Sequence, residues 1–248
     1  MKKIILSTMA LFLVTQAFAF NITDPFYMPK KEAFYLDSAL VLENSGNLRA
    51  YGLQEKFVYG IMDNLSVSLG LGYAKVKHGD NGLQDPVIGA RYRLQEEDKG
   101  TMTIDLLGYI SPSIFDSPYN NEGGVAKGST DFGFSVMGGS REYLANTMLW
   151  MEVGIDFIGS TKWSKSGNII GIAANAKYYL DDYNSFSGGL FGKNYTGFND
   201  NYTGFGIKLD YARMLQDNLA LIPFWSAEKR SDDLPSEVIY GIMVRYTF

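Results

Sequence analysis

Apolar and polar residues alternate with a period of two along most of the chain. The clearest apolar row is Leu65, Val67, Leu69, Leu71 and Tyr73. Residues 149–157, 170–180 and 205–211 show the same alternation. A period of two indicates β-strands with one apolar face. A soluble β-sandwich could also alternate, but its strands average about 5–6 residues. These runs are longer, and they match the roughly 9–11 residues of a tilted strand that crosses a bilayer.

Turn residues divide the alternating segments into an up-and-down series. Short connections rich in Asp and Asn, such as 62–64, occur at every second position, and the others, such as 112–129, are mostly longer. This asymmetry is typical of outer-membrane barrels, with short periplasmic turns and long external loops. We predict an all-β fold, a closed antiparallel up-and-down transmembrane β-barrel of about 12 strands. The predicted strands lie near 33–43, 48–60, 65–77, 85–95, 101–111, 130–143, 147–159, 168–180, 185–195, 202–214, 218–229 and 236–248.

Two of these segments fit the alternation poorly. In 48–60, Glu55 falls in the apolar row and Lys56 in the opposite row, which suggests a β-bulge. In 218–229 both rows are apolar until Glu228, which favours an inward-facing even row. Pro223 would then interrupt the strand on its lipid side, where a bulge would have to accommodate it.

The first residues have the pattern of a secretory signal peptide. Lys2 and Lys3 precede an apolar run over 4–14, and Ala17 and Ala19 fit the motif that signal peptidase cleaves. The run is shorter than the roughly 20 residues of a spanning helix. We therefore predict cleavage after Ala19 and export to the outer membrane of a Gram-negative cell. An uncleaved anchor or a buried core helix is the alternative.

The chain then divides into three parts. Residues 1–19 are the signal peptide, 20–32 a periplasmic segment that could enter the barrel as a plug, and 33–248 the barrel. The last predicted strand has an apolar row that includes Tyr246 and ends at Phe248. A C-terminal aromatic residue after an alternating row resembles the signal read by the outer-membrane assembly machinery. We predict that this machinery and outer-membrane lipid are partners of the chain.

Composition excludes several other classes. The chain has no cysteine, so it has neither disulfides nor thiolate metal sites. Its net charge of −5 comes without a basic cluster, which argues against nucleic acid as a partner. It contains 17 Tyr, 16 Phe and 27 Gly, at a mean hydropathy of only −0.08. This mixture is typical of a barrel with an apolar outer face and a polar lumen.

The polar rows predict the charges that line the lumen. A charge that faces hydrocarbon costs several kcal/mol, so these residues should point inward and pair. They are Asp37, Arg91, Arg93, Asp105, Arg141, Glu152, Asp156, Lys177, Lys208, Asp210, Glu228, Glu237 and Arg245. Positive and negative side chains are nearly balanced. This indicates either a weakly selective pore of mixed polarity or a charge network that fills the barrel, and the residues favour neither.

Catalysis and metal binding have little support in the sequence. His78 is the only histidine, and the serine that outer-membrane phospholipases carry two residues after theirs is missing. Asp80 and Asp85 could touch a divalent ion, but a solvated acidic loop explains them better, since no His or Cys cluster accompanies them. We predict no enzymatic activity, no catalytic residue and no cofactor.

Three motifs resemble a known family. They are Asp24-Pro25-Phe26-Tyr27-Met28-Pro29-Lys30, Gly60-Ile61-Met62-Asp63-Asn64-Leu65 and the segment over 82–94. The chain resembles the outer-membrane transporters grouped as the "MetA-pathway of phenol degradation" family. It departs from the family pattern at Gln84, where a glycine is typical, and at Arg91, where a lysine is typical. The resemblance implies a channel for small solutes, including aromatic or apolar compounds, and supplies no catalytic residue.

We therefore expect a porin-like transport protein of the outer membrane. Small solutes would pass through its lumen by passive or facilitated diffusion. Two alternatives stay open: a structural or adhesion barrel that acts through its external loops, and a lipid-modifying enzyme. The sequence leaves the oligomeric state undetermined.

Overall fold

The computed structural model describes most of the chain after residue 20. It covers residues 21–46, 48–79, 81–98, 101–115, 129–144, 146–160, 165–198, 201–231 and 234–248. The predicted signal peptide with Ala17 and Ala19, the predicted first residue Phe20, and Asp80 lie outside these ranges. None of the described residues belongs to a helix long and apolar enough to cross a membrane.

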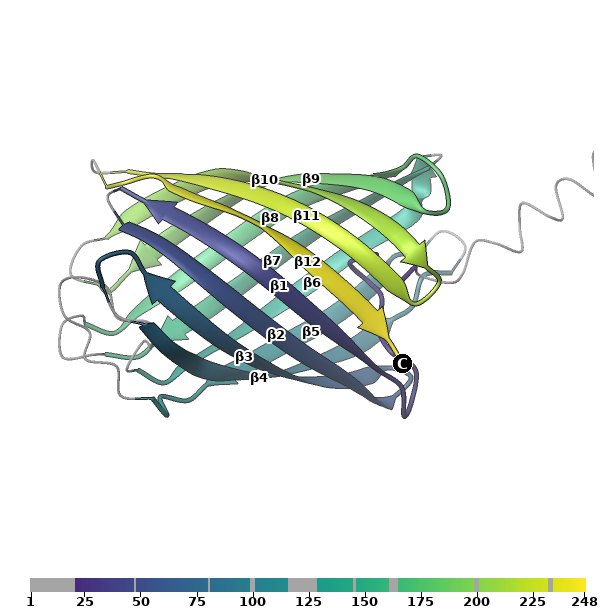
Figure 1. Cartoon of the computed structure of the whole chain (residues 1–248). Helices are drawn as coiled ribbons and strands as arrows, with labels where there is room; N and C mark the ends of the chain where they lie inside the picture. Colours follow the sequence, from purple (N-terminus) through teal and green to yellow (C-terminus); the bar gives the residue numbers. More distant parts are fainter. Residues whose placement is uncertain are drawn as a thin grey trace, which may run out of the picture.

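Twelve antiparallel strands close into one barrel (Figure 1). Each strand pairs with its neighbours in sequence, and the first pairs with the last. The prediction of an all-β, up-and-down barrel is confirmed, and the predicted strand ends are correct to within a few residues. The strands are β1 (Phe34–Ser45), β2 (Leu48–Met62), β3 (Leu65–Val76), β4 (Asn81–Gln95), β5 (Thr103–Ser111), β6 (Asp131–Leu144), β7 (Thr147–Ile158), β8 (Gly167–Tyr179), β9 (Asn184–Thr196), β10 (Tyr202–Gln216), β11 (Leu219–Arg230) and β12 (Glu237–Thr247).

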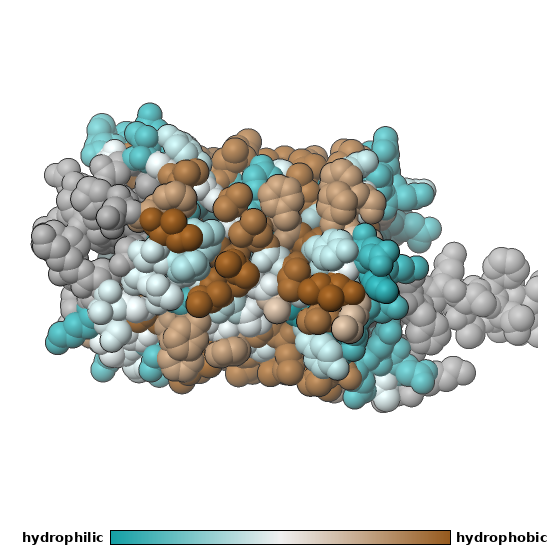
Figure 2. All heavy atoms as spheres, turned by 90° about the horizontal axis from the view of Figure 1, so that it is seen from below, coloured by the Kyte–Doolittle hydropathy of each residue, from teal (hydrophilic) through white to brown (hydrophobic). Residues whose placement is uncertain are grey.

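The alternation separates an apolar outer face from a polar inner one. On β3, Leu69 and Leu71 are exposed on the outside, whereas Ser66 of the other row is buried. Similar outward rows on the other strands form a band of apolar side chains between two more polar ends (Figure 2). Such a band is the surface that a barrel presents to lipid.

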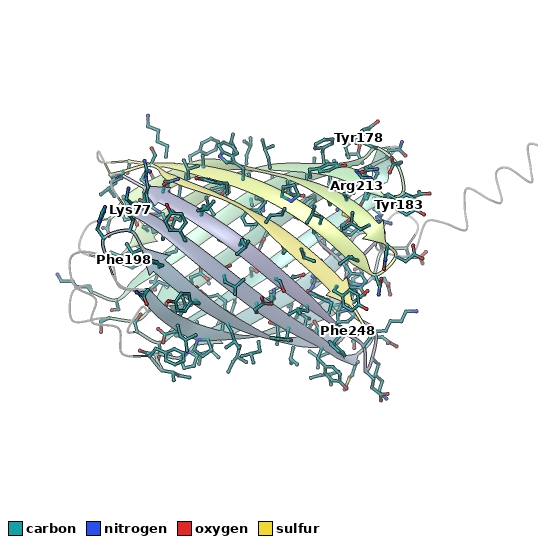
Figure 3. The ribbon with its side chains drawn as sticks, in the orientation of Figure 1. Lys77, Tyr178, Tyr183, Phe198, Arg213 and Phe248 are labelled. Atoms are coloured by element: carbon teal, nitrogen blue, oxygen red, sulfur yellow. The ribbon has the colours of Figure 1, made fainter. Side chains whose placement is uncertain are left out.

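The barrel closes where the two ends of the sequence meet. The backbone N–H of Phe248 donates to the carbonyl of Phe34 at 3.0 Å, and their rings stack with centroids 4.1 Å apart. Figure 3 shows Phe248 at the same end as Tyr183 and Arg213, with Lys77 at the opposite end. The short connections gather at the end that carries Phe248, which we assign to the periplasmic side.

The bulge suspected around Glu55 is absent. Pairing with β1 is continuous from residue 48 to 59, and the register with β3 shifts only between Gly60 and Met62. Glu55 therefore keeps its place in the outward row, and the Ser38 hydroxyl donates to its Oε2 at 2.6 Å. The inward row contains Lys56. The poor fit in the sequence thus reflects a carboxylate on the lipid-facing side.

Pro223 is accommodated without a bulge. The pairing of β10 with β11 passes from Asp210–Phe224 to Arg213–Leu221 with no change of register. The two intervening pairs, which include Pro223, are missing. Proline has no N–H to donate, so the ladder is interrupted locally while the alternation of the two faces continues.

Candidate functional site

The segment before β1 lies inside the barrel, near its periplasmic end. Its side chains Ile22, Asp24, Phe26 and Met28 are buried. Its contacts extend around the wall, from β4 through β6, β7, β8, β10 and β11 to β12. A segment that touches strands on all sides of a closed barrel occupies the lumen.

Two apolar side chains anchor this N-terminal segment. Phe26, which has 0% of its surface exposed, packs against inward-facing Met137, Met148 and Trp150. Ile22 packs in the same way against residues of β10 and β11, namely Ala212, Ala220 and Ile222. The apolar inner row of β11, unexplained in the sequence, is thus the surface against which the segment packs.

Asp24 is the polar anchor. The Tyr179 hydroxyl donates to its Oδ1 at 2.6 Å, and Lys177 Nζ lies 3.6 Å from the same oxygen. Arg141 forms an ion pair with the other carboxylate oxygen. Lys177 is only 1% exposed, so its charge depends on Asp24 and on neighbouring oxygens for compensation.

Backbone carbonyls of the segment accept further hydrogen bonds from cations of the wall. In each of four contacts, a side chain that the sequence predicts to point inward donates to a main-chain oxygen of the segment. They are Arg245 Nη1 to Ile22 O at 2.8 Å, Lys177 Nζ to Thr23 O at 2.6 Å, Arg93 to Phe26 O, and Arg91 Nη1 to Tyr27 O at 3.4 Å.

Gly60 lets the segment reach β1. A side chain at this position would collide with the carbonyl oxygens of Pro29 and Lys30, which pass directly over it. Glu32 N–H donates to Gly60 O at 2.8 Å, and Lys31 N–H donates to Asp63 Oδ1 at 3.1 Å. Two residues of the motif over 60–65 therefore hold the place where the chain leaves the lumen.

The wall cations at this level also pair with wall carboxylates. Asp105, 0% exposed, accepts from Arg91 Nε at 2.8 Å and from Arg93 Nε at 2.9 Å. Asp37 on β1 accepts from both Arg245 Nε, at 2.6 Å, and Nη2, at 2.7 Å. This bidentate geometry gives the most directional form of the arginine–carboxylate pair.

A cavity of about 810 Å³ occupies the lumen. Glu152 and Asp156 from β7, Lys208 from β10 and Lys56 from β2 line it. The Ser135 hydroxyl donates to Glu152 at 3.0 Å, and the Tyr109 hydroxyl to Asp156 at 2.9 Å. A cavity of this volume is large enough for a small organic solute.

Most of the predicted lumen residues fall into two groups. One surrounds the N-terminal segment and contains Asp37, Arg91, Arg93, Asp105, Arg141, Lys177 and Arg245. The other lies at the cavity and contains Glu152, Asp156 and Lys208, and Arg91 reaches both. Asp210 follows Lys208 on the same inward row, and the structure gives it no hydrogen bond or ion pair among the described residues.

Several residues of the lumen escape the sequence pattern. Asp24 precedes the first strand, so alternation cannot assign it a direction. Lys56 was obscured by the apparent conflict with Glu55. Lys193 falls in the inward row of β9, so alternation alone predicts that it faces the lumen. Its Nζ lies 2.9 Å from Glu228.

A polar cluster lines the opposite end of the barrel. Glu228 accepts from the Tyr195 hydroxyl at 2.8 Å as well as from Lys193. Arg230 lies 3.3 Å from Glu228 and 3.0 Å from Glu237. Glu228 and Glu237, which the sequence predicts to face the lumen, therefore both have ion-pair partners at this end of the barrel.

His78 and Asp85, the described residues considered for catalysis and metal binding, lie in an exposed turn and in a contact between a strand and a loop. His78 is exposed in a turn with a positive φ of 63°. Asp85 accepts the N–H groups of Ile114 and Phe115 at 2.9 and 3.1 Å, which ties β4 to the loop after β5. Among the described residues no group of three metal-ligating side chains comes together.

Solved structures with a similar fold include outer-membrane channels. The COG4313 outer membrane channel from Pseudomonas putida F1 matches with a TM-score of 0.77 and 10% identity, over 93% of this chain and 100% of that one. The NanC porin matches with a TM-score of 0.59 and 13% identity, over 86% and 100%. The KdgM porin matches with a TM-score of 0.55 and 12% identity, over 86% and 99%.

No protein-family model matches the sequence, and no curated protein sequence matches it. At these identities the structural likeness establishes the fold alone. The chain is a transmembrane β-barrel of the outer-membrane type. The resemblance to the phenol-degradation transporters stays a prediction.

Proposed function

We propose that this protein is an outer-membrane channel for small solutes, closed at its periplasmic end by a plug formed by residues 21–32. The observation that carries the proposal is the arrangement of the plug in the lumen. Polar contacts from β4, β6, β8 and β12 hold it, together with two apolar side chains. Among the described residues, its only covalent connection to the wall is its continuation into β1.

Such a plug can leave without disrupting the barrel. The twelve strands close through their own ladder, to which residues 21–31 contribute no strand. Hydrogen bonds from the wall cations to carbonyl oxygens exchange readily for hydrogen bonds to water or to a solute. Release of the plug would connect the cavity with the periplasm and complete a path along the barrel.

The wall around the plug is suited to a solute path. With the plug absent, Arg91 and Arg93 would still face Asp105, and Arg245 would still face Asp37. The resemblance to phenol-degradation transporters favours aromatic or apolar solutes, and rings such as Tyr27 and Tyr35 border the cavity. We assign the protein to the outer membrane of a Gram-negative cell, inserted by the assembly machinery.

A barrel that acts only through its external loops is the second candidate, because a lumen filled at one end is also compatible with a closed structure. Planar-bilayer recordings of the mature protein and of a variant that lacks residues 21–31 separate the two. A channel predicts low or intermittent conductance for the full chain and a large, stable increase on deletion. Equal, negligible conductance of both forms, each folded, would contradict the channel.

A further inference from the structure

The ionic groups that line the cavity differ from those around the plug. The seven predicted lumen charges around the plug each have an ion-pair partner, whereas Asp210 of β10 has none among the described residues. At the cavity, Arg91 is paired with Asp105 and Lys193 with Glu228. Asp85 is bound to backbone amides, and Glu55 belongs to the outward row. The charges that remain at the cavity without an ion-pair partner among the described residues are those of Glu152, Asp156, Lys56 and Lys208.

These four charges are segregated by sign. Glu152 and Asp156 both lie on β7, four residues apart in the same inward row. Neutral hydroxyls hold them in place, from Ser135 and Tyr109. Lys56 stands on β2, five strands from β7 in the circular order of twelve and therefore close to the opposite side of the barrel. Lys208 stands on β10, three strands from β7.

The wall between the carboxylates and Lys208 has free space at Gly171 of β8. Gly154 and Gly171 pair across β7 and β8, and Gly171 pairs in turn with Lys193 on β9. A Cβ added at Gly171 would meet no atom closer than 4.0 Å. Next to this gap, the Phe191 ring borders the cavity and carries Lys193 Nζ 5.1 Å from its centroid. The gap and the ring together offer space and an apolar surface between two regions of opposite charge.

We propose that the cavity is a binding subsite for small zwitterions that carry a protonated amine and a carboxylate, such as ω-amino acids. The amine would lie against Glu152 and Asp156, the carboxylate would reach Lys208 or Lys56, and the carbon chain would pass over Gly171 and Phe191. Charges of opposite sign in equal number favour neither a pure anion nor a pure cation. A solute with both charges can satisfy both sides at once. This inference rests on the proposed channel function, and it assigns zwitterions to the channel in place of the aromatic or apolar solutes that the family resemblance favours.

Titration calorimetry of the purified, full mature protein in detergent tests the subsite. The probes are 4-aminobutanoate, butylamine and butanoate, which share one chain length. The zwitterion is expected to bind at least about tenfold more tightly than either singly charged probe, because each charge pair in the cavity contributes at least about 1.4 kcal/mol. Equal affinities, or no binding of 4-aminobutanoate at millimolar concentrations, would overturn the proposal.

Matched variants locate the two ends of the solute. Glu152→Gln with Asp156→Asn keeps an acceptor for each hydroxyl and should abolish the preference for the zwitterion over butanoate. Lys56→Met with Lys208→Met should abolish its preference over butylamine. Lys77→Met with Asp182→Asn makes equivalent changes at exposed sites in turns outside the cavity and should change nothing. Loss of the preference in this control pair alone, or its survival in both cavity variants, would contradict the assignment.

The outcome can be separated from that of the channel. If the variant without residues 21–31 conducts and zwitterions have no advantage, the subsite is wrong and the channel stands. If zwitterions bind but neither form conducts, the channel is wrong and the cavity is a closed binding site.

Discussion

The Tyr179 hydroxyl donates a 2.6 Å hydrogen bond to Oδ1 of Asp24, 155 residues earlier in the chain. Tyr179 is the last residue of the inward row of β8, whereas Asp24 belongs to a segment with no periodicity. Their contact fixes the N-terminal segment on the inside of the barrel. It also places the carboxylate within reach of Lys177 and Arg141.

Replacing Asp24 should release the plug. Asp24→Ala leaves Lys177 and Arg141 without their shared carboxylate, and removing one partner of a buried ion pair typically costs about 3–5 kcal/mol. We expect more frequent and larger openings in planar bilayers, together with greater anion selectivity. Lys31→Gln, a change of charge in the same segment but at an exposed side chain, is the control. Closed traces for Asp24→Ala identical to those of the parent would show that this contact does not hold the plug.

Gly60→Ala tests the place where the plug leaves the lumen. The new Cβ would collide with the carbonyls of Pro29 and Lys30, so the segment must shift from its position. Conductance should increase, and protease cleavage in residues 21–32 should become faster. Gly138→Ala introduces the same methyl group on the outer face of β6, where its Cβ would meet no atom closer than 3.5 Å, and should leave both readings unchanged. Similar behaviour of the two variants would argue against the described path.

Arg91→Ala combined with Arg93→Ala should destabilise the barrel. Asp105, fully buried, loses both of its cations, and the carbonyls of Phe26 and Tyr27 lose their donors. We expect a clearly lower melting temperature, and in open channels a shift of the reversal potential towards cation selectivity. Arg213→Ala, at an exposed position of the outer face, serves as the reference. Unchanged melting, conductance and selectivity would mean that the two arginines do not serve the lumen.

Phe248→Asp should slow assembly while export continues. The change removes the stacking of Phe248 on Phe34 and places a charge where aromatic side chains are favoured at the membrane interface. Pulse-chase labelling should show accumulation of unfolded, processed chain, detected by the absence of a heat-modifiable band. Phe248→Tyr keeps an aromatic ring and should assemble almost normally. Normal kinetics for Phe248→Asp would refute the insertion signal.

The mature chain should begin at Phe20. Cleavage after Ala19 would leave the plug directly at a free N-terminus, with one residue before Asn21. Mass spectrometry of protein purified from outer membranes measures this end, and a heat-modifiable shift on gels reports the closed barrel. A mass that includes residues 1–19 would exclude cleavage, and the plug would then stay joined to that N-terminal segment.

Alternation by itself predicted much of this protein. Side chains of a strand point to opposite faces with a period of two, and the need to keep charge away from hydrocarbon assigns one face to the lumen. Those two local rules are sufficient for the twelve strands. They also give the inward direction of Arg91 and Arg93, and the pairing of both with Asp105 on the next strand follows from their proximity.

Only the tertiary structure decided what those rules leave open. The inner row of β11 is apolar because Ile22, almost 200 residues earlier, packs against it. The periodicity of β11 contains no trace of that partner. Asp24 reaches Arg141 and Lys177 across the lumen for the same reason. A segment without periodicity has no predictable face, and its position depends on which side chains the closed wall brings together around it.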